Sequence, residues 1–366
     1  MLTNIDYKKR ENRWLGFDNY YKFTTATEDS TADLVCERRV AQLHLRFTPE
    51  DMVALSFWFG AVGSPASIIF AKNFGNFSGN SFNAIMHFFE ENKHRISFAS
   101  DAKYRKIHFE QFIKSLCNSL GNKTIYGFVV DRLTQYTGTL DQQPYLTYNA
   151  LHDNCIDNWW QWGRMGQWCF AEALNSYTDI PILPRNMEFG EQGKSHTAGW
   201  LLANEKRWLD SNHTDLSQEA ITDFENWAKD YLTSLKAQGY TKNVNFYTLE
   251  TACCNYKRQH KGSRYAGCYI DELYDDLQKF NKDWPEYIDV YYAFMEARQA
   301  VLPNDLLYEN SDDFVPNKPA YQESWHEAFM EYGRMPRVEA WINKDKQRWC
   351  DLVELGYDHN LEGMWT

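Results

Sequence analysis

Apolar residues recur along most of this chain at intervals of three and four positions, the spacing that places side chains on one face of an α-helix. The pattern predicts helices over residues 49–59, 100–121 and 215–239. Runs rich in β-branched residues are sparse, and only 124–130 and 180–183 are candidates for short strands. The expected fold class is therefore mainly α, with few short strands.

The ends of the predicted helices carry capping signals. Thr48 is a suitable N-cap before Pro49, and Gly60 is expected to close that helix. Ser100 is expected to begin the second helix, and Asp215 with Gln218, in a capping-box pattern, the third. These signals predict where the helices begin and end from the local sequence alone.

No linker or internal repeat divides the chain, so we expect a single helical catalytic domain over 1–366. Residues 303–319 contain three prolines and an acidic run, which predict a long surface loop. Residues 320–366 would then form a C-terminal helical extension.

The composition is that of a globular protein, with 43% hydrophobic and 24% charged residues. A net charge of −12 argues against a protein that coats nucleic acid without specificity, although it allows a local basic cleft. Because the chain shows neither a long apolar run nor a signal peptide, we expect a soluble cytoplasmic protein with no membrane partner. The eight cysteines are scattered, so neither a metal site nor a disulfide framework is indicated.

Residues 246–271 hold the densest group of reactive side chains. Glu250, Cys254 and Lys257 follow one another at i, i+4 and i+7, which places them on one face of the predicted helix. The alternative is that Glu250 and Lys257 form an ordinary solvated ion pair. Spacing alone does not decide between these interpretations.

A turn is predicted directly after this helix. Gly262 should break the helix, Arg264 and Tyr265 follow it, and Gly267 should open the next helical run. Such a turn would direct a cation and a phenol toward whatever the helix faces. Tyr256 and Tyr265 could equally be core aromatic residues whose hydroxyl groups reach water.

A second cluster lies at residues 163–174, where two glycines flank Arg164 at the start of a helix that carries Glu172. Glycine permits a tight turn and leaves backbone N–H groups directed at an anion. The arrangement loosely resembles the helix-hairpin-helix of DNA glycosylases, although its glycine spacing differs.

Residues 189–200 form a third cluster, predicted to be a glycine-flanked loop. It offers Lys194, Ser195, His196 and Thr197 as donors to phosphate or pyrophosphate oxygens. A Walker A motif is excluded, because Glu188 stands where that motif requires glycine. An exposed polar turn is the alternative.

Together, GRMGQWCFAEAL (163–174), GKSHTAGW (193–200) and TLETACCNYKRQHKGSRYAGCYIDE (248–272) resemble the phage amino acid:DNA transferases. These are helical enzymes of thymidine hypermodification, related to the α-glutamyl and putrescinyl thymine pyrophosphorylases. The resemblance covers roughly residues 40 to 300, with motif-grade similarity confined to these segments.

The resemblance implies a reaction on DNA that carries 5-hydroxymethyluracil activated as a pyrophosphate ester. A free amino acid would attack the exocyclic methylene and expel pyrophosphate. Candidates to neutralise the leaving group are Lys194, His196, Arg164 and Arg264, with Ser195 as a further donor. The chemistry leaves room for Mg²⁺, but the sequence shows no ligand pattern for it.

The nucleophile must lose a proton, and Glu172 or Glu250 could accept it if burial raises the pKa of that carboxyl group. The carboxylate of the amino acid needs its own cation, a role for Lys257 or Arg264. A target base flipped out of the duplex would stack on an aromatic side chain. The candidates for that platform are Tyr256, Tyr265 and Trp168.

Two other functions remain open from the sequence. A DNA glycosylase or lyase would use a lone acid or a reactive lysine, and a noncatalytic helical scaffold or DNA-binding accessory would need no convergent site. The transferase hypothesis requires three remote segments to fold into one pocket, so that Glu172, Lys194, Glu250 and Arg264 converge; the 194 segment on the opposite side of the molecule from the helix after residue 246 would contradict it.

Overall fold

The computed structural model describes residues 5–99, 102–134, 143–190, 194–204, 216–303, 307 and 320–343. Within these ranges the regular elements are helices, and the β-type pairing is a single isolated bridge between Ser78 and Thr124. The predicted mainly α class is therefore confirmed. Among the described residues, no helix has both the length and the apolar character needed to cross a membrane.

Contacts along the chain divide the protein into two compact units. Unit 1 comprises residues 1–32, 186–275 and 298–366, and unit 2 comprises 33–185 and 276–297. Both units are assembled from segments far apart in sequence, so neither is a simple stretch of chain. A single catalytic domain over 1–366 stays a prediction.

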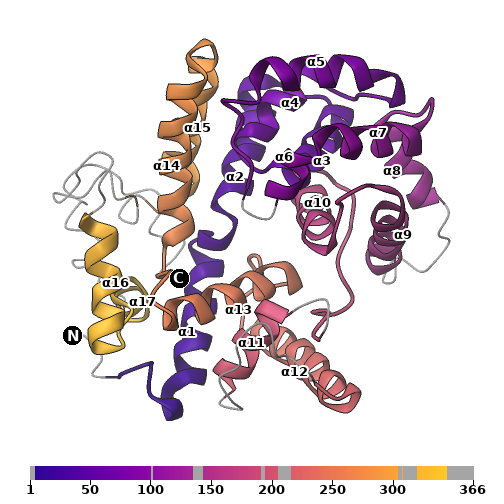
Figure 1. The fold of residues 1–366 in the computed structure, drawn as a ribbon. Coiled ribbons are helices and arrows are strands. Elements are labelled where there is room, and N and C mark those ends of the chain that lie inside the picture. The colour runs from indigo at the N-terminus through magenta and orange to yellow at the C-terminus, as the bar shows by residue number, and fades with distance from the viewer. Residues whose placement is uncertain are drawn as a thin grey trace. The chain divides into compact units, whose positions relative to one another are not determined.

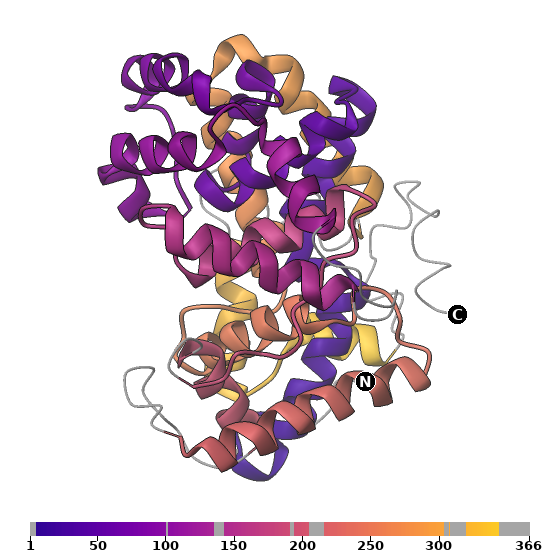
Figure 2. The same ribbon diagram turned by 90° about the vertical axis from the view of Figure 1, so that its right-hand side faces the viewer.

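Unit 1 is built on helix packing around α1 and α13, which contact each other and cross in the view of Figure 1; Figure 2 shows the same helices turned by 90°. Its helices are α1 (Arg13–Ala26), α11 (Lys194–Ala203), α12 (Gln218–Ala237), α13 (Phe246–His260), the first half of α14 (Cys268–Asp283), α16 (Ala320–Tyr332) and α17 (Pro336–Ile342). Short 3-10 turns at Arg10–Asn12 and Asp29–Thr31 flank α1. α16 and α17 lie within the predicted C-terminal extension.

Helices α11 and α13 of unit 1 approach each other closely at Gly199. A Cβ atom on Gly199 would lie 2.0 Å from the carbonyl oxygen of Cys253. Since no Cβ contact in proteins is that short, only glycine allows the two helices to lie this close together. This approach sets the geometry of the candidate site below.

Unit 2 is a helical assembly around the buried helix α3. Its helices are α2 (Ala32–Arg39), a π-helix at Val40–Leu45, α3 (Pro49–Val62), α4 (Ala66–Phe74), a 3-10 turn at Gly79–Ser81, α5 (Phe82–Asn92), α6 (Lys103–Ile107), α7 (Phe109–Leu120), α8 (Ile125–Thr134), α9 (Gln143–Asn158), α10 (Arg164–Tyr177), a 3-10 turn at Pro285–Tyr287 and most of α15 (Ile288–Val301). α3 packs against α10, where Gly60 faces the carbonyl of Gly166. Aromatic residues fill this core, which accounts for much of the aromatic content.

The predicted helix over 49–59 forms and extends further than its signals indicated. Thr48 and Asp51 make a reciprocal capping box at its start. Gly60 lies inside α3, and Gly63, at φ +87°, ends the helix instead. Glycine inside a helix is tolerated here because the backbone of α10 approaches at that point.

The helix predicted over 100–121 is two helices, α6 and α7. His108 interrupts it with φ −114° and ψ 35°, outside the helical region, and Gly121 ends α7 as expected. In the third predicted helix the N-cap is Ser217, whose side chain accepts from the amide of Ala220. The predicted caps Ser100 and Asp215 lie outside the described residues, as does nearly all of the predicted 303–319 loop.

Both strand predictions are wrong. Residues 125–134 form helix α8, in which Ile125, Phe128 and Val129 are buried at helical spacing and the Thr124 hydroxyl accepts from the amide of Gly127. The β-branched residues of this segment therefore pack on one helical face, and tertiary burial overrides their strand propensity. Residues 180–183 are irregular and are not paired with a strand in the described structure.

Candidate active site

Helix α13 carries the residues of the predicted face. It begins at Phe246 after a capping box formed by Asn245 and Thr248. Glu250 and Lys257 are both 4% exposed, so their charged groups are held inside the protein rather than on a solvated surface. A solvated ion pair, the alternative from the sequence, is therefore wrong.

The segment from Lys194 to Thr197 forms the first turn of α11, so the predicted loop is wrong in this part. The run that follows, 198–203, is buried. Its burial against α13 stabilises the helix. The Thr197 hydroxyl accepts from the amide of Gly190 and joins the helix to the preceding chain. The Lys194 side chain lies outside the described side chains.

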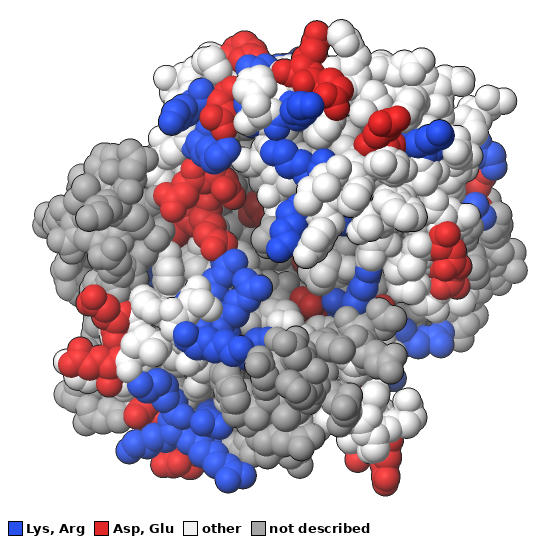
Figure 3. Space-filling view, in the orientation of Figure 1, with Lys and Arg blue, Asp and Glu red and all other residues white. Residues whose placement is uncertain are grey.

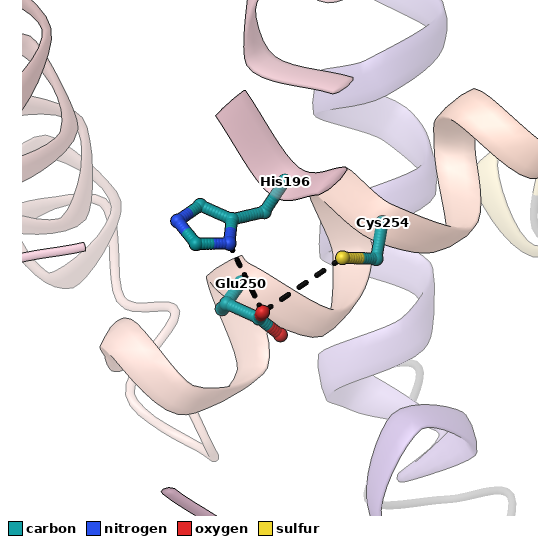
Figure 4. A group of neighbouring side chains, drawn as sticks. All are labelled: His196, Glu250 and Cys254. Carbon is teal, nitrogen blue, oxygen red and sulfur yellow. Dashed lines mark hydrogen bonds and ion pairs between the residues drawn. The ribbon is translucent and has the colours of Figure 1, made fainter. Parts of the chain in front are cut away.

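His196 and Glu250 form a buried pair across the two helices. The Nδ1 atom of His196 lies 3.0 Å from Oε1 of Glu250, and both side chains are at most 5% exposed (Figure 4). A carboxylate only accepts hydrogen bonds, so Nδ1 carries a proton and Nε2 is the ring nitrogen that can present a lone pair. Nε2 is buried and has no hydrogen-bond partner among the residues that the structure describes. A buried, oriented nitrogen of this kind is suited to accept a proton from a substrate.

One residue earlier on α11, Ser195 contacts the lysine of the same α13 face. The Nζ of Lys257 donates to Oγ of Ser195 at 2.9 Å. The ammonium therefore lies at the N-terminal end of α11, where the helix dipole and backbone N–H groups favour an anion. Two consecutive residues of α11 therefore contact charged residues of α13: Ser195 contacts the ammonium of Lys257, and His196 contacts the carboxylate of Glu250.

Cys254 completes a group of possible metal ligands. Its sulfur lies 3.8 Å from Oε1 of Glu250, and with His196 the three ligand atoms fall within 4.8 Å of one another (Figure 4). Imidazole, thiolate and carboxylate together suit zinc-like ions and do not match the all-oxygen preference of Mg²⁺. The sequence did not indicate this group, because its histidine is distant from the other two residues along the chain.

The turn after α13 follows its prediction, with Gly262 at φ +70° and Gly267 at φ +94°. Its cation and phenol, however, are engaged within unit 1. Arg264 pairs with Glu272 and lies 5.0 Å over the ring of Tyr269. The Tyr265 hydroxyl donates to Asp271 at 2.7 Å. Both side chains therefore support the start of α14 in this structure.

A buried charge cluster underlies that turn, and sequence reasoning missed most of it. Asp29 accepts from the amides of Gly267, Tyr269 and Ile270, which caps α14 from a segment remote in sequence. Burial raises the pKa of Asp29 to about 6, and the hydrogen bond from Gly267 opposes the rise. In the sequence, the one signal for this contact is that Asp29 carries a carboxylate, a group that can cap a helix.

Asp271 belongs to the same cluster. Its carboxylate lies 3.4 Å from the guanidinium of Arg337, and both side chains are fully buried. Burial raises the pKa of Asp271 to about 7, while Arg337 and the Tyr265 hydroxyl lower it. The cluster holds α14 against α17, so we assign it a structural role.

Two of the three predicted stacking residues are core residues. Tyr256 is fully buried, and its hydroxyl donates to the carbonyl of Arg13 at 2.8 Å. Trp168 is 1% exposed. Neither presents a ring face that a base could reach in this structure.

Arg164 and Glu172 lie in unit 2, on α10. Arg164 begins the helix after Gly163, as predicted, and its guanidinium lies 4.5 Å from the Trp168 ring. Glu172 is half-buried in the middle of the helix. α9, a short turn and α10 form a helix pair, but its relation to the helix-hairpin-helix stays a prediction.

A buried acid, imidazole and ammonium at one helix junction of a helical fold are suited to proton transfer beside an anion. The family model of the amino acid:DNA transferases matches residues 52–265, more than half of the chain, and the chain belongs to this family. It is therefore an enzyme that transfers an amino acid to DNA, and the glycosylase and accessory interpretations are set aside.

A relative of the chain supports this assignment. The "serinyltransferase" of Salmonella phage ViI is 23% identical over 373 residues, which cover 94% of this chain and 86% of the relative. No solved structure matches the chain.

Proposed function

We propose that this enzyme joins an amino acid to 5-hydroxymethyluracil that is activated in DNA as its pyrophosphate ester. The new bond forms between the nucleophilic atom of the amino acid and the exocyclic methylene carbon. The bond from that carbon to oxygen breaks, and pyrophosphate leaves with the electron pair. The activated base follows from the family resemblance.

Proton removal from the nucleophile is assigned to His196. Its Nε2 lone pair accepts the proton, and the carboxylate of Glu250 at Nδ1 stabilises the imidazolium that forms. The observation that carries this assignment is the buried Nε2 atom without a hydrogen-bond partner. Glu250, predicted as the base itself, would act through the imidazole as a positioning residue.

Recognition of the amino acid is assigned to Lys257 and Ser195. In an α-amino acid the carboxylate lies two bonds from the amine. A cation that binds the carboxylate must therefore lie close to the base that reaches the amine. The contact from Lys257 to Ser195 places an ammonium one residue from His196 along α11. Of the predicted partners of the pyrophosphate, Lys194 opens α11 in the same unit as His196 and stays a proposal, whereas Arg164, on α10 of unit 2, stays a prediction.

Serine is the first amino acid to test, because the phage relative is described as a serinyltransferase. Either its amine or its hydroxyl could be the nucleophile, and the same base serves both. DNA bearing the pyrophosphate ester is incubated with each amino acid, digested to nucleosides and analysed by mass. The expected product gains one amino-acid residue as one pyrophosphate is released.

Variants separate the two roles. We expect His196→Asn to lower kcat by about 10²- to 10⁴-fold, the usual contribution of a general base. Lys257→Met should mainly raise the KM for the amino acid. The matched control is Lys236→Met, at an exposed position of α12, which should behave as the wild type. Unchanged kcat in His196→Asn would contradict the assignment, and abasic sites in place of a mass gain would indicate a glycosylase.

A further inference from the structure

Unit 2 contains a pocket that plays no part in the site described above. It lies between the start of α6, the end of α9 and the turn that leads into α10, and its volume is about 420 Å³. That size falls in the range of ordinary ligand pockets. The pocket has no assigned ligand.

Aromatic side chains dominate its lining, and two of them are unusually exposed. Tyr104 is 57% and Trp160 is 52% exposed, although large aromatic rings are normally covered unless they meet a partner. Trp160 is nevertheless held in place, because its amide donates to the Ser115 hydroxyl at 2.7 Å. The ring is therefore presented from a fixed turn.

The inner wall of the pocket is rigid. Trp162 is 2% exposed and stacks nearly parallel to Phe57 and Phe112, with interplanar angles of 11° and 3°. Arg105 donates to the carbonyl groups of α3 and lies 5.4 Å from the Trp162 ring. A flat ligand would meet preformed aromatic surfaces rather than side chains that must first be ordered.

The charge around the pocket favours an anionic ligand. None of its lining residues is acidic, and Arg105 is basic, although the whole chain has a net charge of −12. The ammonium of Lys103 lies 5.1 Å from the ring of Tyr104, a lining residue. On the face drawn in Figure 3, basic and acidic side chains of the described residues both occur. The lining of the pocket contains a basic residue and no acidic one.

The start of α10 adds a site for a phosphate next to the rings. Gly163 caps α10 without a side-chain hydrogen bond, and a Cβ at this position would meet no atom within 4 Å. An anion can therefore approach the first-turn N–H groups, which a helix N-terminus favours. Aromatic rings for a base beside N–H donors for a phosphate suit a nucleotide as ligand.

We propose that this pocket binds one unpaired nucleobase of the DNA substrate, stacked against Trp160 and Tyr104. A base within a duplex has both faces covered by its neighbours, so only an unstacked base can use these rings. Lys103 and the start of α10 bind the adjoining phosphate. The proposal rests on the DNA substrate of the family and is independent of the pyrophosphate chemistry.

The test compares two fluorescein-labelled duplexes by anisotropy with the full chain. One contains a central unpaired thymidine, and the other an abasic sugar at that position. We expect the wild type to bind the thymidine duplex about tenfold more tightly, since stacking of one base contributes about 5- to 150-fold. Trp160→Ala should reduce this preference to near unity, and Trp160→Phe should retain most of it.

The matched control is Tyr292→Ala on α15, an exposed tyrosine of unit 2 that does not line the pocket. It should keep the full preference, and so should His196→Asn, because no reaction occurs in the assay. Melting curves establish that Trp160→Ala is folded. An undiminished preference in Trp160→Ala would overturn the proposal. The absence of any preference in the wild type would overturn it as well.

Discussion

Glu37 is a carboxyl group that the protein should hold in its neutral form at neutral pH. It lies on α2, is fully buried, and accepts from the hydroxyl groups of Ser67 at 2.7 Å and Tyr177 at 3.1 Å. Burial raises its pKa to about 8, while the hydroxyl groups lower it. Glu37→Gln replaces the neutral acid with a neutral side chain of nearly the same shape.

The sign of the effect follows from proton binding. The folded state binds the proton up to about pH 8, whereas the unfolded chain releases it near the ordinary value of 4.5. Between these values the folded state holds more protons, so Glu37 makes the free energy of unfolding fall as pH rises. Its stabilising contribution is complete below pH 4.5 and lost by about pH 8. At about 1.4 kcal/mol per pH unit, the loss has an upper limit of about 5 kcal/mol.

We therefore expect Glu37→Gln to resemble the wild type near pH 5 and to exceed its stability by a few kcal/mol at pH 8.5. Urea unfolding at a series of pH values measures the difference. Glu110→Gln, which removes an exposed carboxylate from α7, is the control and should show little pH dependence. A difference between Glu37→Gln and wild type that stays constant from pH 5 to 9 would refute the elevated pKa.

Three further substitutions test the packing and the site. Gly199→Ala places a Cβ 2.0 Å from the carbonyl oxygen of Cys253, so thermal unfolding should show a loss of about 1–3 kcal/mol or more, and transfer should fall at least tenfold. Cys254→Ser should keep transfer within about threefold, because the serine hydroxyl can replace the weak 3.8 Å contact from the thiol to Glu250. Loss of activity together with loss of bound zinc would instead favour a metal site. Thr48→Ala removes the cap of α3 and should cost about 0.5–2 kcal/mol in urea unfolding, without changing the KM for the amino acid.

The parts of this fold that the sequence predicts are those governed by neighbouring residues. The N-cap at Thr48, the break at Gly262 and the start of the next helix at Gly267 depend on local interactions, and each is confirmed. Segment 124–130 was assigned wrongly because its β-branched residues also satisfy helical spacing once a core covers one face. The interruption at His108 likewise depends on packing around it rather than on a breaker residue.

Burial of aromatic residues was the least predictable property of the site. Tyr256, Trp168 and Trp160 are similar in type, yet the first two are almost fully buried and the third is about half exposed. Composition carries no information about which ring faces outward, since this depends on how helices from distant segments pack. The predicted stacking residues were therefore mostly core residues, and the exposed rings lay elsewhere.

The contacts of the candidate active site show where prediction from sequence can reach further. The i, i+4, i+7 spacing on α13 correctly placed Glu250 and Lys257 on one face, but it could not name their partners on α11, which lie 54 and 62 residues away along the chain. The missing information is the distance between the two helices, and one glycine sets it. Because Gly199 is required for that approach, the same residue that allows the helices to pack also brings His196 and Ser195 to the charges of α13. Fold and site thus share one steric condition, so a family sequence with a larger residue at this position should have lost the buried pair.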